Sequence, residues 1–260
     1  MATLVDLAGV QLDALPRQPV DAGPDEGLEE SAQAVDPAAS IARAERHELA
    51  VRRVGAVSSA PDPADRSAYG TYAAQAVDAL GLANISGREV LAVHARQTRT
   101  GVKNRLPNPW GLYRLLALLV YDQAVRDRAG LPLRFNSLHR DGPYNAAIGG
   151  ASRSAHRACT ARDRVLVGGT VRQLWEGDRA LRGKRVRLTT AQAKVLAAVA
   201  RDYELGPAFT ESVFGEPFSA RGLGYVSSGT SASYTHTGGL GRYGTFVHAD
   251  ARGAAADWRG

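Results

Sequence analysis

Cysteine is nearly absent from this chain, and its scarcity excludes one class of protein. Only one of the 260 residues is a cysteine, Cys159. A single thiol cannot form an intramolecular disulfide, so a disulfide-stabilised secreted scaffold is excluded and folding in a reducing cytoplasm is expected. Long apolar runs are also missing. The longest, residues 115–120, is far shorter than the ~20 residues of a membrane-spanning helix, so no membrane partner is expected.

The first 65 residues contain no aromatic side chain and are rich in Ala, Asp, Glu and Pro. Such a segment buries too little apolar surface to offset its chain entropy, so we predict a disordered acidic tail or linker over residues 1–65. Its first residues carry acids where a secretory signal would carry bases, which predicts a chain made in the cytoplasm without a signal peptide.

Charge follows the same division of the chain. Residues 1–65 carry 12 acids and 5 bases, a net charge of −7, whereas the remainder carries 14 acids and 27 bases, a net charge of +13. A basic body favours a polyanionic partner, either nucleic acid or an acidic cell wall. An arginine-rich coding bias explains the same composition without a partner, and composition alone leaves this alternative open.

The hydrophobic pattern of residues 66–260 changes from helical to extended near residue 131. Helical spacing and helix-capping residues predict four helices, over residues 67–80, 86–100, 109–129 and 190–204. Residues 102–108 are expected to form an irregular loop. Extended runs are predicted over residues 131–137, 164–167, 225–227, 233–236 and 245–252. Because helices precede strands without a βαβ alternation, we predict an α+β fold in which helices flank an antiparallel sheet. The domain is then divided into a helical part, residues 66–130, and a catalytic core, residues 131–260.

Two histidines and an aspartate, with a second carboxylate nearby, are typical of a zinc hydrolase site. His156 and Asp163 are seven residues apart, which on a continuous helix would separate them by about 10.5 Å along the axis. One zinc ion binds its nitrogen and oxygen ligands at about 2.0–2.2 Å, so we expect a turn between these two residues. His248 and Asp250 are two residues apart in an extended run and therefore share a face. A third ligand from that strand would leave a fourth position for water, as a catalytic zinc site requires.

These residues and the sequence around them resemble the zinc D-alanyl-D-alanine carboxypeptidase family. The closest type is the carboxypeptidase-like C-terminal domain of phage endolysins and virion-associated lysins. The resemblance extends over residues 86–258 and is carried by Ser-x-His-x6-Asp at 154–163, Phe-x-His-x-Asp at 246–250, and the segments 104–107, 132–137, 140–150, 239–243 and 246–253, with Trp258 at the end. It implies a hedgehog/DD-peptidase-like fold.

Carried over residue by residue, the resemblance implies zinc as cofactor, with His156, Asp163 and His248 as ligands. Arg140 matches the arginine that binds a carbonyl or carboxylate of the substrate, a role that suits a permanently charged guanidinium. Ser154 and Tyr144 are further candidates for substrate binding.

The resemblance leaves the general base open between two residues. Asp250 is the candidate that would take a proton from water. Many relatives carry the base three residues before the last histidine, where this chain has Thr245, and Asp250 would then orient His248 instead. His236 is a further candidate proton carrier.

Two positions depart from the family pattern. Cys159 replaces the usual glycine three residues after the first histidine, and His139 replaces a tyrosine next to Arg140. A cysteine is strained where the backbone needs a positive φ, so this departure affects turnover more than metal binding.

The function predicted from these features is a zinc-dependent peptidase that cleaves peptidoglycan stem peptides, as a carboxypeptidase or an endopeptidase. It would act at the bacterial cell wall, reached through phage lysis or as part of a virion, with phage virion or tail proteins as candidate partners of the N-terminal tail. The alternative is a non-catalytic virion or wall-binding structural protein with the same fold. A nucleic-acid binder is supported by charge alone and by no recognisable motif, so nucleic acid is not expected as a partner.

Overall fold

The computed structural model describes residues 60–205, 211–212, 217–218, 232–235, 237–251 and 255–260. The predicted disordered tail before residue 60, the predicted extended run at 225–227 and His236 lie outside these residues. The boundary at residue 65 stays a prediction. The described chain starts in contact with the body, because Tyr203 Oη donates a hydrogen bond to the carbonyl of Pro61 at 2.9 Å.

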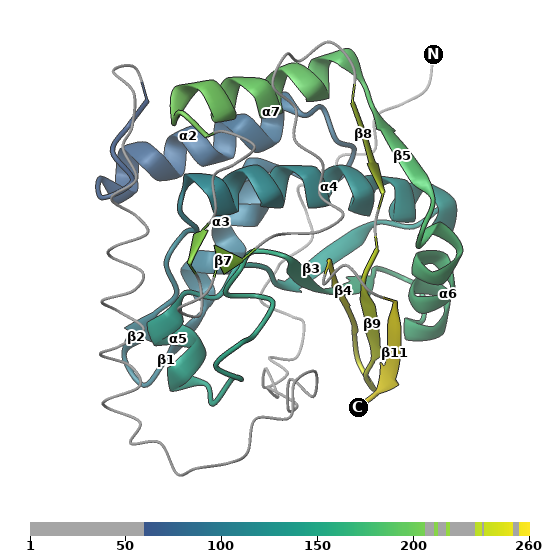
Figure 1. Ribbon diagram of the computed structural model, residues 1–260. Coiled ribbons are helices and arrows are strands. Elements are labelled where there is room, and N and C mark those ends of the chain that lie inside the picture. Colours follow the sequence, from purple (N-terminus) through teal and green to yellow (C-terminus); the bar gives the residue numbers. More distant parts are fainter. Residues whose placement is uncertain (1–59, 206–210, 213–216, 219–231, 236, 252–254) are drawn as a thin grey trace.

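Helices and short strands together form an α+β fold, as predicted (Figure 1). The helices are α2 (Arg66–Ala79), α3 (Gly87–Arg96), α4 (Pro109–Ala129), α5 (Gly142–Ala147), α6 (Val171–Leu181) and α7 (Thr190–Asp202). The strands are β1 (Thr98–Arg99), β2 (Val102–Lys103), β3 (Leu133–Ser137), β4 (Ala161–Leu166), β5 (Arg185–Leu188), β6 (Glu211–Ser212), β7 (Pro217–Phe218), β8 (Ala232–Thr235), β9 (Gly239–Arg242), β10 (Val247–Asp250) and β11 (Ala256–Arg259). Within the described residues, no helix combines the length and the hydropathy needed to cross a bilayer.

Helix α4 is the centre of the core. The side chain of Asn108 accepts a hydrogen bond from the backbone of Gly111, Pro109 occupies the first turn, and Gly130 ends the helix in the left-handed conformation with φ 67°. Its buried residues lie all around the helix axis, as expected for a helix enclosed by other elements. Figure 1 shows α2 and α7 on one side of α4 and the largest sheet on the other.

The largest sheet has five strands in the order β11-β9-β10-β4-β3. Neighbouring strands are antiparallel except β11 and β9, which pair in parallel. The register aligns one residue from each strand in a single row across the sheet. In strand order, this row is Trp258, Gly241, His248, Asp163 and Ser137. The sheet therefore places two of the predicted zinc ligands next to each other.

Several element boundaries differ from the sequence-based predictions. The helix predicted to reach residue 100 ends at Arg96, because residues 98–103 form a β1–β2 hairpin whose turn has Thr100 and Gly101 at φ 47° and 79°. The strand predicted at 164–167 starts three residues earlier, at Ala161. Its first half contains three consecutive charged residues, Arg162, Asp163 and Arg164. Such a run does not predict a buried strand unless the partners of these charges are known.

Helices α5 and α6 were not predicted. Helix α5 has only six residues, too few to show a helical period, and it starts where the carboxylate of Asp141 accepts from the backbone of Tyr144. Helix α6 has a capping box formed by Thr170 and Gln173, but Gly177 interrupts its sequence pattern. The capping box predicted at residues 189–192 is confirmed at the start of α7.

Candidate metal centre

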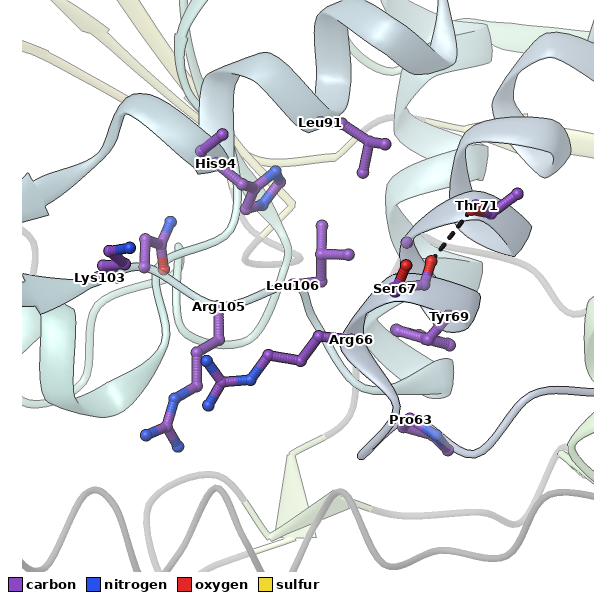
Figure 2. A pocket seen from close by; sticks show the side chains of 13 residues that line it. Pro63, Arg66, Ser67, Tyr69, Thr71, Leu91, His94, Lys103, Arg105 and Leu106 are labelled. Atoms are coloured by element: carbon purple, nitrogen blue, oxygen red, sulfur yellow. Dashed lines mark hydrogen bonds between the residues drawn. The ribbon is translucent and has the colours of Figure 1, made fainter.

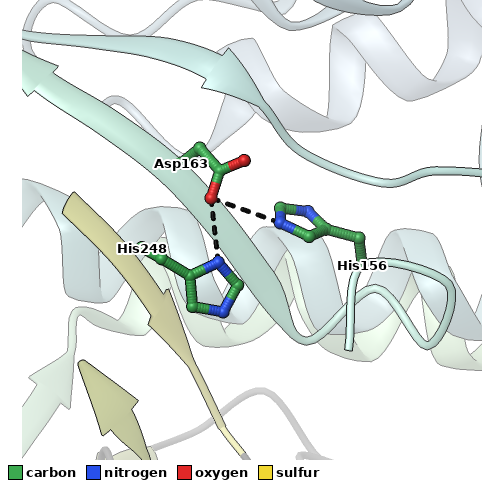
Figure 3. A group of neighbouring side chains, drawn as sticks. All are labelled: His156, Asp163 and His248. Carbon is green, nitrogen blue, oxygen red and sulfur yellow. Dashed lines mark hydrogen bonds and ion pairs between the residues drawn. The ribbon is translucent and has the colours of Figure 1, made fainter. Parts of the chain in front are cut away.

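The three predicted zinc ligands come together at the middle of the five-stranded sheet (Figure 3). Asp163 on β4 and His248 on β10 are direct cross-strand partners, and His156 reaches them from the turns that precede β4. One nitrogen or oxygen atom from each residue lies within 4.8 Å of the others, and all three residues are buried. The sequence-based prediction that these side chains meet is therefore confirmed by the geometry.

The predicted turn between His156 and Asp163 is present. The backbone N–H of Arg157 donates to the carbonyl of Ser154 (3.0 Å), and that of Cys159 donates to the carbonyl of His156 (3.1 Å). From α4, the buried Arg114 donates through Nη1 to the carbonyl of Ala158 at 2.7 Å. These bonds fold the chain back by a series of tight turns, so that His156 and Asp163 can face one another despite their separation in sequence.

Hydrogen bonds fix which ring nitrogen of each histidine faces the centre. His156 Nδ1 lies 2.5 Å from the carbonyl oxygen of Leu138, which leaves Nε2 directed at Asp163 Oδ1, 3.3 Å away. His248 has the opposite orientation: Nδ1 lies 2.8 Å from Asp163 Oδ1, and Nε2 lies 3.3 Å from Asp250 Oδ2. A histidine that donates one N–H to an oxygen offers the lone pair of its other nitrogen to a metal, here Nε2 of His156 and Nδ1 of His248.

These donor atoms fit a zinc ion. His156 Nε2 is buried and makes no hydrogen bond among the described residues, although buried nitrogens are almost always hydrogen-bonded. It is directed at a carboxylate oxygen that also faces the second histidine. Two imidazole nitrogens and one carboxylate oxygen are a ligand set that zinc takes in hydrolytic sites. Without an ion, the arrangement would leave one buried nitrogen unsatisfied.

The electrostatics of the centre differ from residue to residue. Burial and the nearby charge of Arg140 lower the pKa of His156, which is therefore neutral at pH 7. Burial alone would lower the pKa of His248 too, but its hydrogen bonds to Asp163 and Asp250 outweigh burial and raise that pKa to about 9. Burial would raise the pKa of Asp163, but the hydrogen bond with the protonated His248 and the charge of Arg140 hold that pKa well below its usual range. In the absence of metal, His248 thus carries the proton that a metal ion would have to displace.

Arg140 lies on the other side of the Asp163 carboxylate from the histidines. Its Nη2 donates to Asp163 Oδ2 at 2.7 Å, and its Nε donates to Ser137 Oγ at 3.0 Å. Ser137 Oγ also accepts from Gln97 Nε2 at 3.2 Å. The guanidinium therefore orients a predicted ligand.

Asp250 contacts His248 on the side away from Asp163. Its Oδ2 is the atom facing His248 Nε2, and its Oδ1 accepts a hydrogen bond from the backbone N–H of Gly239 at 3.0 Å. Both oxygens of this fully buried carboxylate are thus engaged. This geometry suits a residue that orients His248. Thr245, the position of the base in many relatives, is exposed in the turn before β10.

The two further candidates for substrate binding, Ser154 and Tyr144, are buried beside the centre. Ser154 Oγ accepts a hydrogen bond from the backbone N–H of His156 at 3.3 Å. Tyr144 lies on α5, where burial raises the pKa of its phenol and the charge of Arg140 opposes the rise. Both residues are thus close to the ligands or to Arg140, and their contact with a substrate stays a prediction.

The segment that carries Arg140 is held by an asparagine that the sequence analysis assigned only to a family motif. Asn104 Nδ2 donates to Gln97 Oε1 and to the carbonyl of His139, both at 2.7 Å. Asn104 Oδ1 accepts from the backbone N–H of Asp141 at 2.9 Å. The motif at residues 104–107 was the sequence signal for this supporting role. A buried asparagine needs hydrogen-bond partners for both ends of its amide, so it links the segments that supply them.

Trp258 was also noted only as the end of the resemblance, and it packs against the metal group. Its ring centroid lies 5.5 Å from that of His248, and its Nε1 donates to Tyr243 Oη at 3.1 Å. The ring lies over Gly241, where a Cβ atom would come within 2.5 Å of Trp258 Nε1. Glycine is therefore required at this position of the row, so that tryptophan can reach the side of His248.

A pocket of about 480 Å³ lies elsewhere, between α2, α3 and the loop before α4 (Figure 2). Its lining includes Arg66, Lys103 and Arg105, but not the three candidate ligands. Asn104, which holds the segment of Arg140, also lines it. The pocket therefore adjoins the support of the metal centre without containing the ligands.

The comparison with protein families agrees with this geometry. Residues 86–194 match the family model described as Peptidase M15. The match supports the resemblance to the zinc D-alanyl-D-alanine carboxypeptidase family for this part of the chain, and the two histidines and the aspartate could hold a metal ion. His156 and Asp163 lie inside the matched residues, whereas His248 lies beyond them. No curated protein and no solved structure gives a significant match.

Proposed function

We propose that this protein is a zinc-dependent peptidase that cleaves the stem peptides of peptidoglycan, as a carboxypeptidase or an endopeptidase. The observation that carries the proposal is the buried group of His156, Asp163 and His248, of which two members lie in the residues that match the Peptidase M15 family. Bound by these three residues, a zinc ion would supply Lewis acidity, which polarises a carbonyl and lowers the pKa of water to about 7.

The residues of the chain itself divide the remaining work. Arg140 holds Asp163 through Nη2 and is the candidate that binds the carbonyl or carboxylate of the substrate, because its guanidinium contacts the ligand Asp163 directly. Asp250 fixes the ring of His248 through its Nε2. We assign Asp250 this positioning role in preference to the role of general base, because both of its oxygens are engaged away from Asp163. His236 then remains a candidate for the base.

Peptidoglycan is the expected polymer, and the net charge of +13 over residues 66–260 suits a wall that is rich in carboxylate and phosphate. The protein would act at the bacterial cell wall. Phage virion or tail proteins are the candidate partners of residues 1–65.

The experiment that tests the proposal is digestion of purified peptidoglycan followed by mass spectrometry of the released fragments. We expect new peptide termini with the wild-type chain, none after treatment with a chelator, and recovery when zinc is added back. The His156→Ala variant serves as the inactive control. Fragment patterns that are identical with and without chelator would reject a zinc peptidase, and the mass of the fragments identifies the scissile bond.

A second candidate function is a non-catalytic wall-binding or virion protein with the same fold. Cys159 supports it, because this residue adopts φ 57° where the family usually has glycine, three residues after a ligand. This candidate predicts sedimentation of the protein with cell walls and no released fragments at any zinc concentration.

A further inference from the structure

The side of β4 that faces away from the metal group carries a second cluster of charged residues. Side chains alternate along a strand, so Arg162 and Arg164 point away from Asp163, which lies between them. Their partners are Asp122 on α4 and Asp178 on α6. All four side chains are fully buried, with 0% of their surface exposed. We call these four residues the ionic network.

The contacts of the ionic network are forked and mutually supporting. Arg162 donates through Nε and Nη2 to both oxygens of Asp122, at 3.0 and 2.9 Å. Arg164 bridges the two acids, donating to Asp122 Oδ1 at 2.6 Å and to Asp178 Oδ2 at 2.7 Å. Two guanidinium groups thus neutralise two carboxylates, and the planar fork fixes orientation as well as distance.

The network also holds the strand of the second histidine. Arg162 Nη1 donates to the carbonyl of Ala249 at 3.3 Å. Ala249 pairs with Arg162 in the register and lies between His248 and Asp250 on β10. Both strands that supply metal ligands are therefore anchored to α4 at the level of the ligands themselves.

Stability alone is a weak explanation for such a cluster. Burying ions has a large desolvation cost, and replacing a buried ionic cluster by apolar side chains of similar volume is often neutral or stabilising. A forked arginine contact fixes the position of the strand, whereas an apolar side chain does not. A zinc site needs this, since its ligand distances vary by only about ±0.2 Å and its residues must be held within about 0.5 Å of their working positions.

We infer that Arg162, Arg164, Asp122 and Asp178 are positioning residues for the metal centre, which hold Asp163 and His248 at the separation that zinc requires. This inference rests on the proposed metal centre. It predicts that a defect in the network changes the affinity and geometry of the bound metal before it unfolds the protein.

The test measures metal binding by the full chain rather than activity. Arg162→Lys keeps the charge but loses the fork and the reach to Ala249, and Arg162→Gln loses the charge as well. We expect zinc affinity, measured by competition with a chelator, to fall by about 10–100-fold in Arg162→Lys, the scale seen for residues that orient metal ligands. The absorption bands of the cobalt(II)-loaded variant should shift or weaken. The fall should be larger in Arg162→Gln.

The matched control is Leu196→Ala, which removes core packing in α7 outside the network. It should lower the melting temperature of the metal-free chain while leaving zinc affinity and the cobalt(II) bands as in the wild type. If Arg162→Lys does not fold, the double variant Arg164→Met/Asp178→Leu replaces the outer pair and leaves Asp122 paired with Arg162. The zinc affinity and the cobalt(II) bands of this double variant are then compared with those of Leu196→Ala.

The outcomes separate the two proposals. A wild-type chain that binds no zinc would overturn the metal centre itself. Zinc affinity and cobalt(II) bands that match the wild type in a folded network variant would overturn only the positioning role. A loss of affinity in Leu196→Ala equal to that in Arg162→Lys would also overturn it, because the effect would then follow general destabilisation.

Discussion

The two faces of strand β4 use buried charge in opposite ways. On one face, Asp163 faces two histidine rings, and His156 Nε2 makes no hydrogen bond among the described residues. On the other face, Arg162 and Arg164 are matched by Asp122 and by Asp178 on α6, through hydrogen bonds of 2.6–3.0 Å. On the first face a carboxylate and two imidazole rings converge on one point that a metal ion could occupy, whereas on the second face both carboxylates are paired with guanidinium groups of the chain.

The pKa values follow the same contrast. Both Asp163 and Asp178 are buried, and burial raises the pKa of a carboxyl. For Asp178 burial prevails, and its pKa is raised although Arg164 opposes the rise. For Asp163 the protonated His248 and Arg140 prevail, and its pKa is lowered well below the usual range. Asp163 is thus kept as an anion in a place where a cation can bind, which is what a metal ligand requires.

The largest effect is expected from removing a candidate ligand on the face of β4 that carries Asp163. We expect His156→Ala to remove the bound zinc, because it deletes one of three ligands and leaves the carboxylate of Asp163 without a ring on that side. Elemental analysis should find about one zinc per wild-type chain and less than a tenth of that in the variant. His94→Ala is the control, since His94 is an equally buried histidine outside the metal group. Equal zinc content in His156→Ala and the wild type would reject the ligand assignment.

A smaller effect is expected from Asp250→Asn, which keeps the shape of the side chain and removes its charge. Because Asp250 contacts His248 Nε2 and the backbone of Gly239, we expect zinc affinity to fall by about 10–100-fold and activity to recover at saturating zinc. A positioning role predicts this recovery, whereas a general base does not. Activity that stays about 10²–10⁴-fold low at saturating zinc would restore Asp250 as the base.

Sequence reasoning located the metal group because its residues lie in short motifs with a definite spacing. The separation of His156 and Asp163 excluded a continuous helix, and the separation of His248 and Asp250 placed them on one face. The pairing of β4 with β10 was not predictable from those patterns, because register depends on contacts between segments 85 residues apart. The row that contains Asp163 and His248 is therefore a property of the folded sheet.

The ionic network could not be predicted in the same way. Arg162 and Arg164 flank Asp163 in the sequence, and charged residues in succession usually indicate a solvated segment. Their burial depends on Asp122 and Asp178, which lie on two different helices. One of these helices, α6, was itself missed because Gly177 weakens its pattern. The local sequence shows only a run of charged residues next to apolar ones. Whether such a run is buried or solvated depends on partners that are distant in sequence.

The pH dependence of zinc binding sharpens the contrast between the faces. His248 has a pKa of about 9 in the metal-free protein, so at pH 7–8 zinc must displace its proton. We expect release of about one proton per zinc and an apparent affinity that rises about tenfold per pH unit toward pH 9. Isothermal titration calorimetry in two buffers of different ionisation enthalpy measures the release. An affinity that is flat from pH 7 to about 8.5 would contradict a protonated His248.

The same pKa has the opposite effect on the metal-free fold. Because the folded-state pKa of His248 lies above its unfolded value of about 6.5, its contribution to stability is fully present below pH 6.5. This contribution is lost as the pH rises through about 9. Raising the pH should therefore destabilise the metal-free chain while it strengthens zinc binding.

The smallest expected effect concerns Cys159, which adopts φ 57° in the turn after His156 and packs in the core. A side chain in the left-handed region costs about 1–2 kcal/mol, and glycine avoids this cost at an entropic penalty of about 0.5–1 kcal/mol. We therefore expect Cys159→Gly to be more stable than Cys159→Ala by about 0.5–1 kcal/mol in denaturant unfolding.

The comparison between the two variants removes the contribution of the sulfur, since neither contains it. The neighbouring Ala158 is the matched control, because it is buried and is not among the residues with positive φ. There, Ala158→Gly should be less stable than the wild type by about 0.5–1 kcal/mol. A Cys159→Gly variant that is less stable than Cys159→Ala would show that the turn imposes no strain. If instead Cys159→Gly is the more stable variant and also releases more peptidoglycan fragments, strain at this turn limits turnover, and the non-catalytic alternative loses its main support.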